Sequence, residues 1–355
     1  MNEPAWRQEG GVRLTSRWLL LGLLAVACGG ASAPAPEATP SPATVHVGIV
    51  GSVSDSALFI ADSRGYFKEQ GITVDFQRFQ SAAVMTPALG RGQLDVGAGA
   101  PSAGLFNAMA REIPLKIVAD KGNVKPGHGY EAYVVRKQLW DSGQLKSPGD
   151  LKGRTVAIAA LDIAPEVELD NFLRSGGLTV KDVKLTPLAF PDMVTALATG
   201  SVDMANIIEP YATQAVSKGV GAVWHRSDEL NPGHQLGVVL YSPDFAKKQD
   251  LARRFMLAYL KGARDYNDAF DKKDSAKRAA VVKILTEQTS VKDASLYDRM
   301  VMPGIDPNGK VNKDSLVSDQ DWFLKYGSQK QKADLNQGID TSFAAWAVQK
   351  LGQYK

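Results

Sequence analysis

An internal repeat is the feature of this sequence that most constrains its fold. The pattern A-L-x-x-G-x-x-D spans 88–95 and recurs at 196–203. A G-x-T-V segment at 71–74 recurs at 177–180, and an apolar run at 47–49 has a counterpart at 156–158. Three correspondences in one order and at nearly constant spacing predict two similar lobes. The alternative is a chance likeness, because helix-ending glycines and buried strands recur in all α/β chains.

Strand and helix patterns alternate from residue 45 onward. Apolar or alternating runs predict strands at 46–50 and 73–76, and helical spacing predicts helices at 57–70 and 84–89. This order is typical of parallel α/β architecture. Extended runs at 130–135 and 234–240 predict two strands that cross between the lobes. The expected boundaries are 45–133 with 237–355 for lobe 1, and 134–236 for lobe 2.

The N-terminal segment predicts export from the cytoplasm. Arg7, Arg13 and Arg17 precede the apolar run 18–27, which is about half as long as a membrane-spanning helix requires. We interpret 1–27 as a signal peptide and the Ala/Pro/Ser-rich segment 28–44 as a linker. Residues 24–28 resemble a bacterial lipobox, although Ala25 stands where that motif prefers leucine. We therefore expect Cys28, the only cysteine, to be lipidated. The alternatives are cleavage after 31–33 and a buried cysteine.

Motifs for common catalytic and cofactor sites do not occur in the sequence. The four histidines lack metal-ligand spacing, and neither a G-x-S-x-G elbow nor a phosphate-binding loop occurs. No cysteine follows Cys28 to serve as a nucleophile. We therefore expect no catalytic residue, no cofactor and no metal. A net charge of +3 gives no strong attraction to nucleic acid.

The glycine-rich segment 97–104 follows a short strand candidate. Its glycines are spaced wrongly for a dinucleotide-binding loop. Pro101 suits the first turn of a helix, and free N–H groups at such a helix start would bind an anion or a carbonyl oxygen. A tight turn without a ligand is the alternative.

Several motifs resemble those of solute-binding proteins of the nitrate/sulfonate/taurine class of ABC transporters. They are GYFKEQGI at 65–72, GQLDVG at 92–97, SPGDLKGRTV at 147–156, IEPY at 208–211, DPNG at 306–309 and IDTSF at 339–343. The resemblance covers about 45–352. It implies an α/β fold of the two-lobe type II periplasmic-binding-protein kind, with two crossover hinge strands. It also implies a monomeric, extracytoplasmic protein that delivers a small molecule to a membrane permease, here tethered through Cys28.

The resemblance places ligand contacts at strand ends and helix starts that face the cleft. The residues that match these positions are Ser52, Ser54, Asp55, Ser81, Ala82, Gly99, Ala100, Pro101, Ser102, Asp162, Phe190, Glu209 and Tyr211. Asp55 and Asp162 could instead cap helices, Glu209 could instead contact the other lobe, and Tyr211 could pack rather than stack on a ligand. On the ligand-binding interpretation, replacing Glu209 by alanine weakens binding without unfolding the protein.

The class of ligand stays open between several chemistries. Carboxylates that face the cleft would repel an anion, so a pyrimidine-like or amino ligand stands beside sulfonate, nitrate and aromatic carboxylate. The repeat diverges after its strand, with small residues at 97–101 and a carboxylate with a phenol at 209–211. This asymmetry predicts a ligand with an acceptor at one end and a donor at the other.

Two further functions are alternatives to solute capture. Enzymes that make the thiamin pyrimidine resemble this chain in fold, but they carry a cysteine-rich motif that this chain lacks. A sensory ligand-binding domain would need a fused signalling or DNA-binding segment. We therefore expect a binding protein rather than an enzyme.

Overall fold

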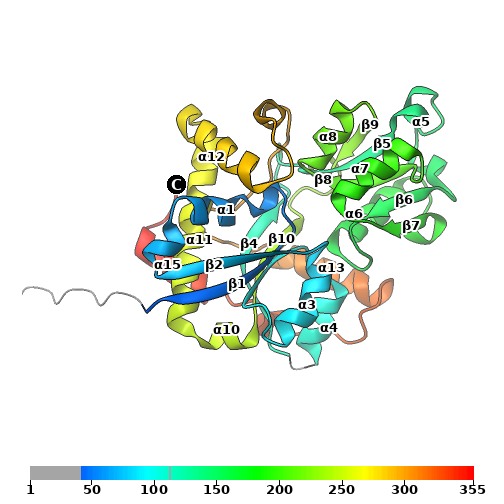
Figure 1. Cartoon of the computed structure of the whole chain (residues 1–355). Coiled ribbons are helices and arrows are strands. Elements are labelled where there is room, and N and C mark those ends of the chain that lie inside the picture. The colour runs from blue at the N-terminus through cyan, green and yellow to red at the C-terminus, as the bar shows by residue number, and fades with distance from the viewer. Residues whose placement is uncertain (1–40, 112) are drawn as a thin grey trace, which may run out of the picture. The chain divides into compact units, whose positions relative to one another are not determined.

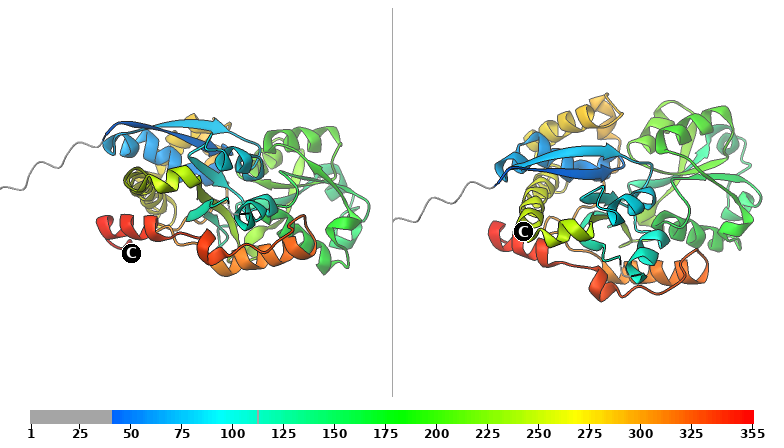
Figure 2. Two further views of the ribbon diagram at one scale, coloured as in Figure 1. Left: turned by 90° about the horizontal axis from the view of Figure 1, so that it is seen from below. Right: turned by 60° about the horizontal axis from the view of Figure 1, so that its bottom comes forward.

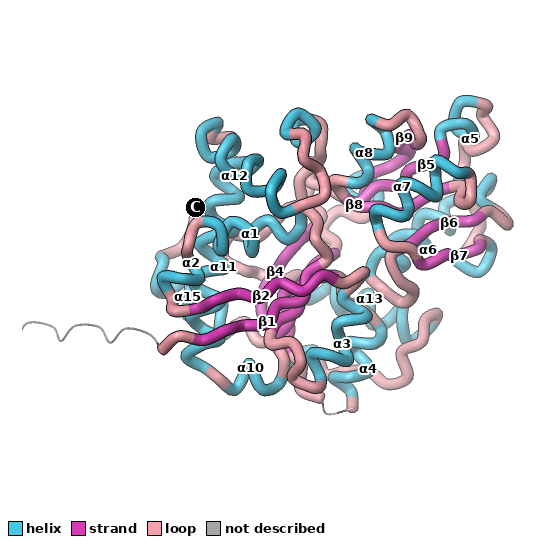
Figure 3. The backbone as a smooth tube through the Cα atoms, viewed as in Figure 1, coloured by secondary structure: helices cyan, strands magenta, loops and turns pink. Residues whose placement is uncertain are grey.

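The structure is a computed structural model that describes residues 41–111 and 113–355. The predicted signal peptide, Cys28 and most of the predicted linker lie outside these residues. The described chain contains two five-stranded sheets, each covered by helices (Figure 1). Figure 3 shows their strands, in magenta, as two separate groups.

The two sheets have the same topology. The first is ordered β2-β1-β3-β10-β4 and the second β7-β6-β8-β5-β9. In each sheet the first three strands are parallel, and the fourth runs antiparallel to both of its neighbours. The strands are β1 (Ala43–Ile49), β2 (Ile72–Arg78), β3 (Val96–Gly99), β4 (Lys116–Asn123), β5 (Glu131–Arg136), β6 (Thr155–Ile158), β7 (Lys184–Pro187), β8 (Met204–Ile208), β9 (Gly221–Arg226) and β10 (Gln235–Tyr241).

Two of the three sequence correspondences match in the structure. The strands at 47–49 and 156–158 are the equivalent strands β1 and β6, and the repeated A-L-x-x-G-x-x-D segments lead into the equivalent strands β3 and β8. The third correspondence fails in part. Residues 72–74 lie in β2, whereas residue 180 opens a short 3-10 helix and β7 begins only at Lys184.

Helices fill the connections and the C-terminal third of the described chain. They are α1 (Ser56–Ser63), α2 (Tyr66–Glu69), α3 (Ala82–Gly90), α4 (Ala103–Ala110), α5 (Lys137–Asp141), α6 (Ala164–Ser175), α7 (Phe190–Thr199), α8 (Tyr211–Ser217), α9 (Ser227–Leu230), α10 (Pro243–Lys247), α11 (Gln249–Phe270), α12 (Ser275–Gln288), α13 (Lys313–Lys325), α14 (Leu335–Gly338) and α15 (Ser342–Leu351). Short 3-10 helices are η1 (Val53–Asp55), η2 (Pro148–Leu151), η3 (Val180–Asp182) and η4 (Ala294–Asp298).

Two sequence expectations about helices are wrong in detail. The single helix expected over 57–70 is two helices, because Gly65 adopts a left-handed conformation with φ +76° and separates α1 from α2. Pro101 does not start a helix. The helix begins at Ala103, and Ser102 caps it by accepting a hydrogen bond from the N–H of Leu105 at 3.1 Å.

The chain crosses between the sheets in two neighbouring connections. β4 of the first sheet leads through 124–130 into β5 of the second, and β9 leads through 227–234 back into β10. The N–H of Val124 donates to the carbonyl of His234 at 2.9 Å, so the two connections touch. The predicted boundaries at 133/134 and 236/237 therefore fall within β5 and β10.

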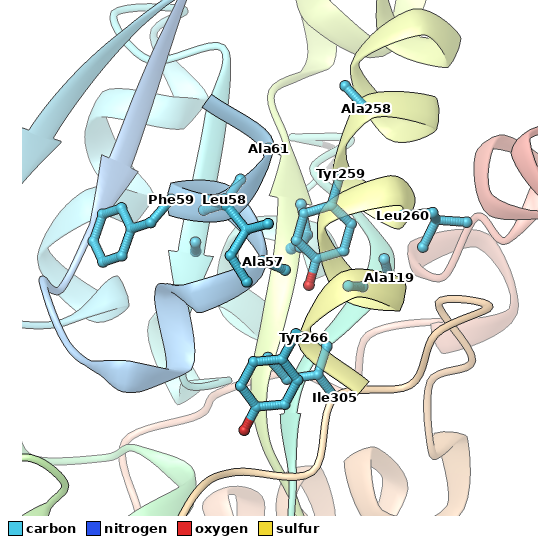
Figure 4. Packing of buried hydrophobic residues seen from close by; sticks show 14 of the residues in the cluster. Ala57, Leu58, Phe59, Ala61, Ala119, Ala258, Tyr259, Leu260, Tyr266 and Ile305 are labelled. Carbon is cyan, nitrogen blue, oxygen red and sulfur yellow. The ribbon is translucent and has the colours of Figure 1, made fainter. Parts of the chain in front are cut away.

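The core of the first sheet rests on a close approach of α1 and α11. Their facing residues, among them Ala57, Leu58 and Tyr259, are fully buried (Figure 4). Gly262 of α11 makes the approach possible, because a Cβ there would overlap the carbonyl oxygen of Ala57. The hydroxyl of Tyr259 donates to the carbonyl of Asp120 at 2.6 Å, which ties α11 to β4.

Helix α13 belongs to the C-terminal segment but packs on the second sheet's helix α6. In Figure 2 the orange segment that contains α13 lies beside the green elements. The indole N–H of Trp322 in α13 donates to Asp170 in α6 at 2.9 Å. Both groups are buried, so this contact joins the C-terminal segment firmly to α6.

Candidate functional site

A cavity lies between the two sheets and is lined by residues from both. About 480 Å³ of its space is free of protein atoms, part of it open to solvent. The lining residues are Val50, Ser54, Gln80, Ser81, Gly99, Ala100, Lys121, Tyr130, Glu131, Ala159, Ile163, Pro165, Phe190, Asn206, Ile208, Leu236 and Gly237. Most of these follow the carboxyl ends of parallel strands, where α/β sheets commonly bind ligands.

Several helices point their N-termini at this cavity. Ser81 is the N-cap of α3, Ile163 is the N-cap of α6, and Phe190 opens α7; all three residues line the cavity. The first N–H groups of a helix have no partner within the helix and carry partial positive charge. Ser81 Oγ is buried and has no hydrogen-bond partner among the described residues. The hydroxyl of Ser81 at the start of α3 can therefore donate a hydrogen bond to an anion or a carbonyl oxygen.

A buried lysine adds a cation to the first wall, which is the side of the cavity formed by the first sheet and its loops. Lys121 of β4 lies 2.9 Å from Oδ1 of Asp55 and donates to Oγ of Ser54 at 2.7 Å. Asp55 also accepts hydrogen bonds from the N–H groups of Gly51 and Ser52, at 2.7 and 3.0 Å. Oδ2 of Asp55 thus accepts two backbone hydrogen bonds, while its Oδ1 faces Lys121. Asp55 and Lys121 form an ion pair without net charge. Lys121 and Ser54 line the cavity, and Asp55 does not.

The second wall, which is the side of the cavity formed by the second sheet and its loops, combines a carboxyl group with an amide. Glu131 of β5 and Asn206 of β8 both line the cavity and are almost fully buried. Burial raises the pKa of Glu131 well above its ordinary value, and the charge of Glu168 raises it further. Both effects favour the protonated form of Glu131. Asn206 supplies a second polar group at this wall.

Five of the thirteen predicted ligand residues line the cavity, and the structure brings them together from both sheets. They are Ser54, Ser81, Gly99, Ala100 and Phe190. Gly99 is required for the close approach of β3 to α3, because a Cβ at Gly99 would lie 2.8 Å from that of Ala82. Ala82 itself lies behind Gly99 and does not line the cavity.

Four other predicted residues serve local structure at the first wall or between the two sheets. Ser52 caps η1 and shares a hydrogen bond with the hydroxyl of Ser54 at 2.8 Å. The carbonyl of Pro101 accepts from the N–H of Ala164 at 3.0 Å, and Ser102 forms an isolated bridge with Ile163. Asp55 is held by Lys121 as described above.

Asp162 contacts the C-terminal segment rather than the cavity. It adopts φ +56°, and its Oδ1 accepts a hydrogen bond from the N–H of Ser328 at 2.8 Å. Its own carbonyl accepts from the N–H of Ala103 at 2.9 Å. Asp162 does not cap α6; its own N–H instead donates to Glu166 in the first turn of that helix. The residue thus links the second sheet's helix α6 to the segments on the first sheet's side.

Glu209 and Tyr211 also lie outside the lining. Glu209 is fully buried, pairs with Arg226 at 3.0 Å, and accepts from the N–H and hydroxyl of Thr213 at 2.9 and 3.0 Å. Tyr211 stacks on Phe190 with ring centroids 6.0 Å apart. It supports a cavity residue from behind.

Five polar residues line the cavity but were not among the sequence predictions. They are Gln80, Lys121, Tyr130, Glu131 and Asn206. Glu131 did leave a signal, because it is a charged residue next to the apolar run 132–135 of its strand, whereas β4, which holds Lys121, contains several charged residues. Asn206 occupies the strand β8 that is equivalent to β3. The other two carry no sequence signal that distinguishes them from ordinary surface residues.

The described residues hold no group of three His, Cys, Asp or Glu side chains suited to a metal ion. Within the same residues, no helix is long and apolar enough to cross a membrane.

Comparisons with known proteins place these features in context. A model of the NMT1-like family matches residues 38–286. The taurine-binding periplasmic protein of Escherichia coli (strain K12) is 28% identical over 210 residues, which cover 58% of this chain and 61% of that protein. The match therefore spans about three fifths of that relative's length.

Solved structures share the fold over almost the whole described chain. The alkanesulfonate-binding protein SsuA from Xanthomonas axonopodis pv. citri, solved with bound MOPS, has a TM-score of 0.68 at 19% identity and covers 84% of this chain and 99% of its own. The desulfurization enzyme DSZB has a TM-score of 0.60 at 17% identity and covers 87% and 99%. At these identities the likeness shows the fold alone, and that fold is found in a binding protein and in an enzyme.

Proposed function

The chain belongs to the NMT1-like family, and from this premise we propose that it is an extracytoplasmic receptor for a small organic or oxyanion ligand. The two-lobe fold predicted from its motifs is confirmed. The observation that carries the proposal is the cavity between the two sheets, lined from both sides. A ligand that touches both sides favours closure by its differential contacts, which is how a two-lobe receptor retains a solute.

The cavity chemistry favours a ligand with an acidic or carbonyl-bearing head. Lys121, Ser54 and the unpaired hydroxyl of Ser81 offer hydrogen-bond donors, and the starts of α3, α6 and α7 add partial positive charge. Much of the remaining lining is apolar, including Phe190 and Ile208. Sulfonates, nitrate, aromatic carboxylates and carbonyl-bearing pyrimidines are the candidate classes, and the names of the taurine-binding and alkanesulfonate-binding proteins favour sulfonates.

Binding rather than catalysis is the proposed activity. Because the desulfurization enzyme DSZB has a similar fold, the fold alone does not distinguish a binding protein from an enzyme. The sequence has one cysteine, Cys28, and that residue precedes the folded lobes. The described residues contain no cysteine, so none of the residues that line the cavity is a cysteine nucleophile.

Delivery to an ABC permease and a lipid tether at Cys28 complete the proposal. The tether would hold a monomeric receptor at the membrane through the linker 28–44, close to its permease. Metabolic labelling with a radioactive fatty acid tests the tether. We expect label in the wild type and none in Cys28→Ser; equal labelling of both would contradict it.

A thermal-shift screen tests the receptor function. The probes are taurine, ethanesulfonate, nitrate, benzoate and a hydroxypyrimidine, each over a concentration series. A ligand that binds only the folded protein stabilises it by about 2.7 kcal/mol at a hundred times its Kd, so one class should raise Tm with concentration while the others do not. A flat response to every probe would count against a small-ligand receptor with these chemistries.

A further inference from the structure

A series of buried ionisable side chains runs from the cavity to the crossings between the sheets. Glu131 lines the cavity, and the charge of Glu168 of α6 raises its pKa. Glu168 Oε1 lies 2.6 Å from Nδ1 of His234, and Oδ1 of Asp319 in α13 lies 2.7 Å from Nε2 of the same ring. His234, at the end of the second crossing, therefore bridges a carboxyl group on α6 and one on α13.

Three oxygens in this series lack a hydrogen-bond donor. Oε1 of Glu131, Oε2 of Glu168 and Oδ2 of Asp319 are buried, and none of them accepts a hydrogen bond from the described residues. Each of the two glutamates shifts the pKa of the other, so their carboxyl groups interact. Two ionised carboxylates would repel each other strongly in a buried site. A single proton shared between them would give the free oxygen of each glutamate a partner.

The surroundings decide where that proton resides. Burial and then the charge of Glu168 raise the pKa of Glu131. Burial raises the pKa of Glu168 as well, but the imidazolium of His234 opposes this rise. Burial alone would lower the pKa of His234, yet Asp319 and Glu168 together raise it well above its ordinary value. These directions favour the proton on Glu131 and a positive charge on His234.

We propose that Glu131 and Glu168 share one proton in the cavity wall, and that His234, through its bridge to Asp319, confines the pair to that single proton. The cavity then presents a neutral carboxyl group to a ligand at neutral pH. A neutral acid makes hydrogen bonds without repelling an oxyanion, so this acidic residue and an anionic ligand can occupy one cavity. This consequence for the ligand rests on the proposed function, whereas the shared proton does not.

Neighbouring ionisable groups do not replace this proton. Burial raises the pKa values of Tyr130, just before β5, and of Tyr133 in β5 well above the ordinary range, so both stay neutral phenols. The remaining charged groups on the adjoining elements are already held in other contacts. These groups are Asp55 with Lys121, Glu209 with Arg226, and Asp120, which accepts from Gly122, Asn123, Gln235 and Asp306.

Infrared spectroscopy of the unliganded protein at pH 8.5 tests the shared proton. Burial raises the pKa of Asp120 and that of Glu166 only to about 7, so both are ionised at this pH. We expect a C=O stretching band of a protonated carboxylic acid in the wild type, its loss in Glu131→Gln, and its retention in the control Glu166→Gln. No band in the wild type, or a band that survives in Glu131→Gln, overturns the proposal. Neither result depends on any ligand, so a failed ligand screen and a failed proton test are distinct outcomes.

The role of His234 is tested by its charge. In His234→Gln, Glu168 and Asp319 both lose the counter-charge of the ring, so we expect the protonated-acid band at pH 8.5 to rise to at least about twice its wild-type intensity. An unchanged band overturns the role of His234. Where that variant does not fold, ¹⁵N NMR of the wild type decides instead: both ring nitrogens of His234 should carry protons at pH 8.5, and a neutral ring overturns the role.

Discussion

At the scale of single residues, Glu209 has a carboxylate that could bind a ligand, but this carboxylate contacts other residues of the protein instead. Its carboxylate is fully buried, and Arg226 and Thr213 occupy it. The prediction from the sequence, that Glu209 binds the ligand, required it to face the cleft. A sequence cannot reveal this difference, because the partner Arg226 is brought to Glu209 only by the pairing of β5 with β8 and β9.

We expect Glu209→Ala to lower stability rather than to act on ligand affinity alone. Removing one partner of a buried ion pair leaves the other uncompensated and costs about 3–5 kcal/mol. Chemical denaturation measures the loss, with Glu229→Ala, an exposed partner of His225, as a control that changes little. If Glu209→Ala kept wild-type stability and weakened binding, the ligand-contact interpretation would be restored.

Ser81 gives the opposite expectation. Its hydroxyl has no partner in the protein, so Ser81→Ala should leave Tm nearly unchanged while raising Kd about tenfold, the value of one hydrogen bond to a charged ligand. Calorimetric titration with the ligand found in the screen measures Kd. The matched control is Ser242→Ala, which removes the cap of α10 and should lose about 1 kcal/mol of stability without a change in Kd.

At the scale of elements, the sequence predicted strands and the repeat better than it predicted the site. Apolar periodicity depends on local burial, which is why the ranges found for β1, β2 and α3 agree with expectation. The walls of the cavity depend on which side chains meet across two sheets. Lys121 and Asp55 are far apart in the chain and form one pair, and no local pattern encodes that meeting.

The packing of α1 on α11 provides an element-scale prediction. A side chain at Gly262 would overlap the carbonyl of Ala57, so Gly262→Ala must push two buried helices apart. We expect a loss of about 1–3 kcal/mol, the usual cost of overpacking. Gly90→Ala in α3 is the control, because a Cβ there makes only ordinary contact with Ile113 and alanine favours a helix. Equal stability of the two variants in urea denaturation would rule out a tight α1–α11 contact.

At the scale of the whole described molecule, the two sheets are joined by more than their crossings. The backbone bonds between 101–103 and 162–164, and the bond from the N–H of Ser328 to Asp162, all connect the two sides of the cavity. No polar residue that lines the cavity takes part in these contacts. They therefore bear on the closure of the protein rather than on recognition of its ligand.

Asp162→Gly tests this closure contact. Glycine accepts the left-handed conformation at φ +56° without strain, so the fold should tolerate the change while the bond to Ser328 disappears. We expect a larger radius of gyration by X-ray scattering and a Kd raised roughly fivefold, equivalent to about 1 kcal/mol lost from the closed state. Asp162→Asn keeps an acceptor oxygen and should behave as the wild type. An unchanged radius and Kd in Asp162→Gly would show that this bond does not favour closure.

The hydrogen bond between Val124 and His234 shows that the segment which forms the second sheet begins and ends at neighbouring points. All strands from β5 to β9 belong to the second sheet, and the chain leaves and re-enters the first sheet at adjacent points. The second sheet is thus an insertion into a first domain that would otherwise be continuous. Insertions with neighbouring ends can be excised, transplanted or circularly permuted with little disturbance to their host. A short turn in place of 125–233 is the natural design for isolating the first sheet with its helices.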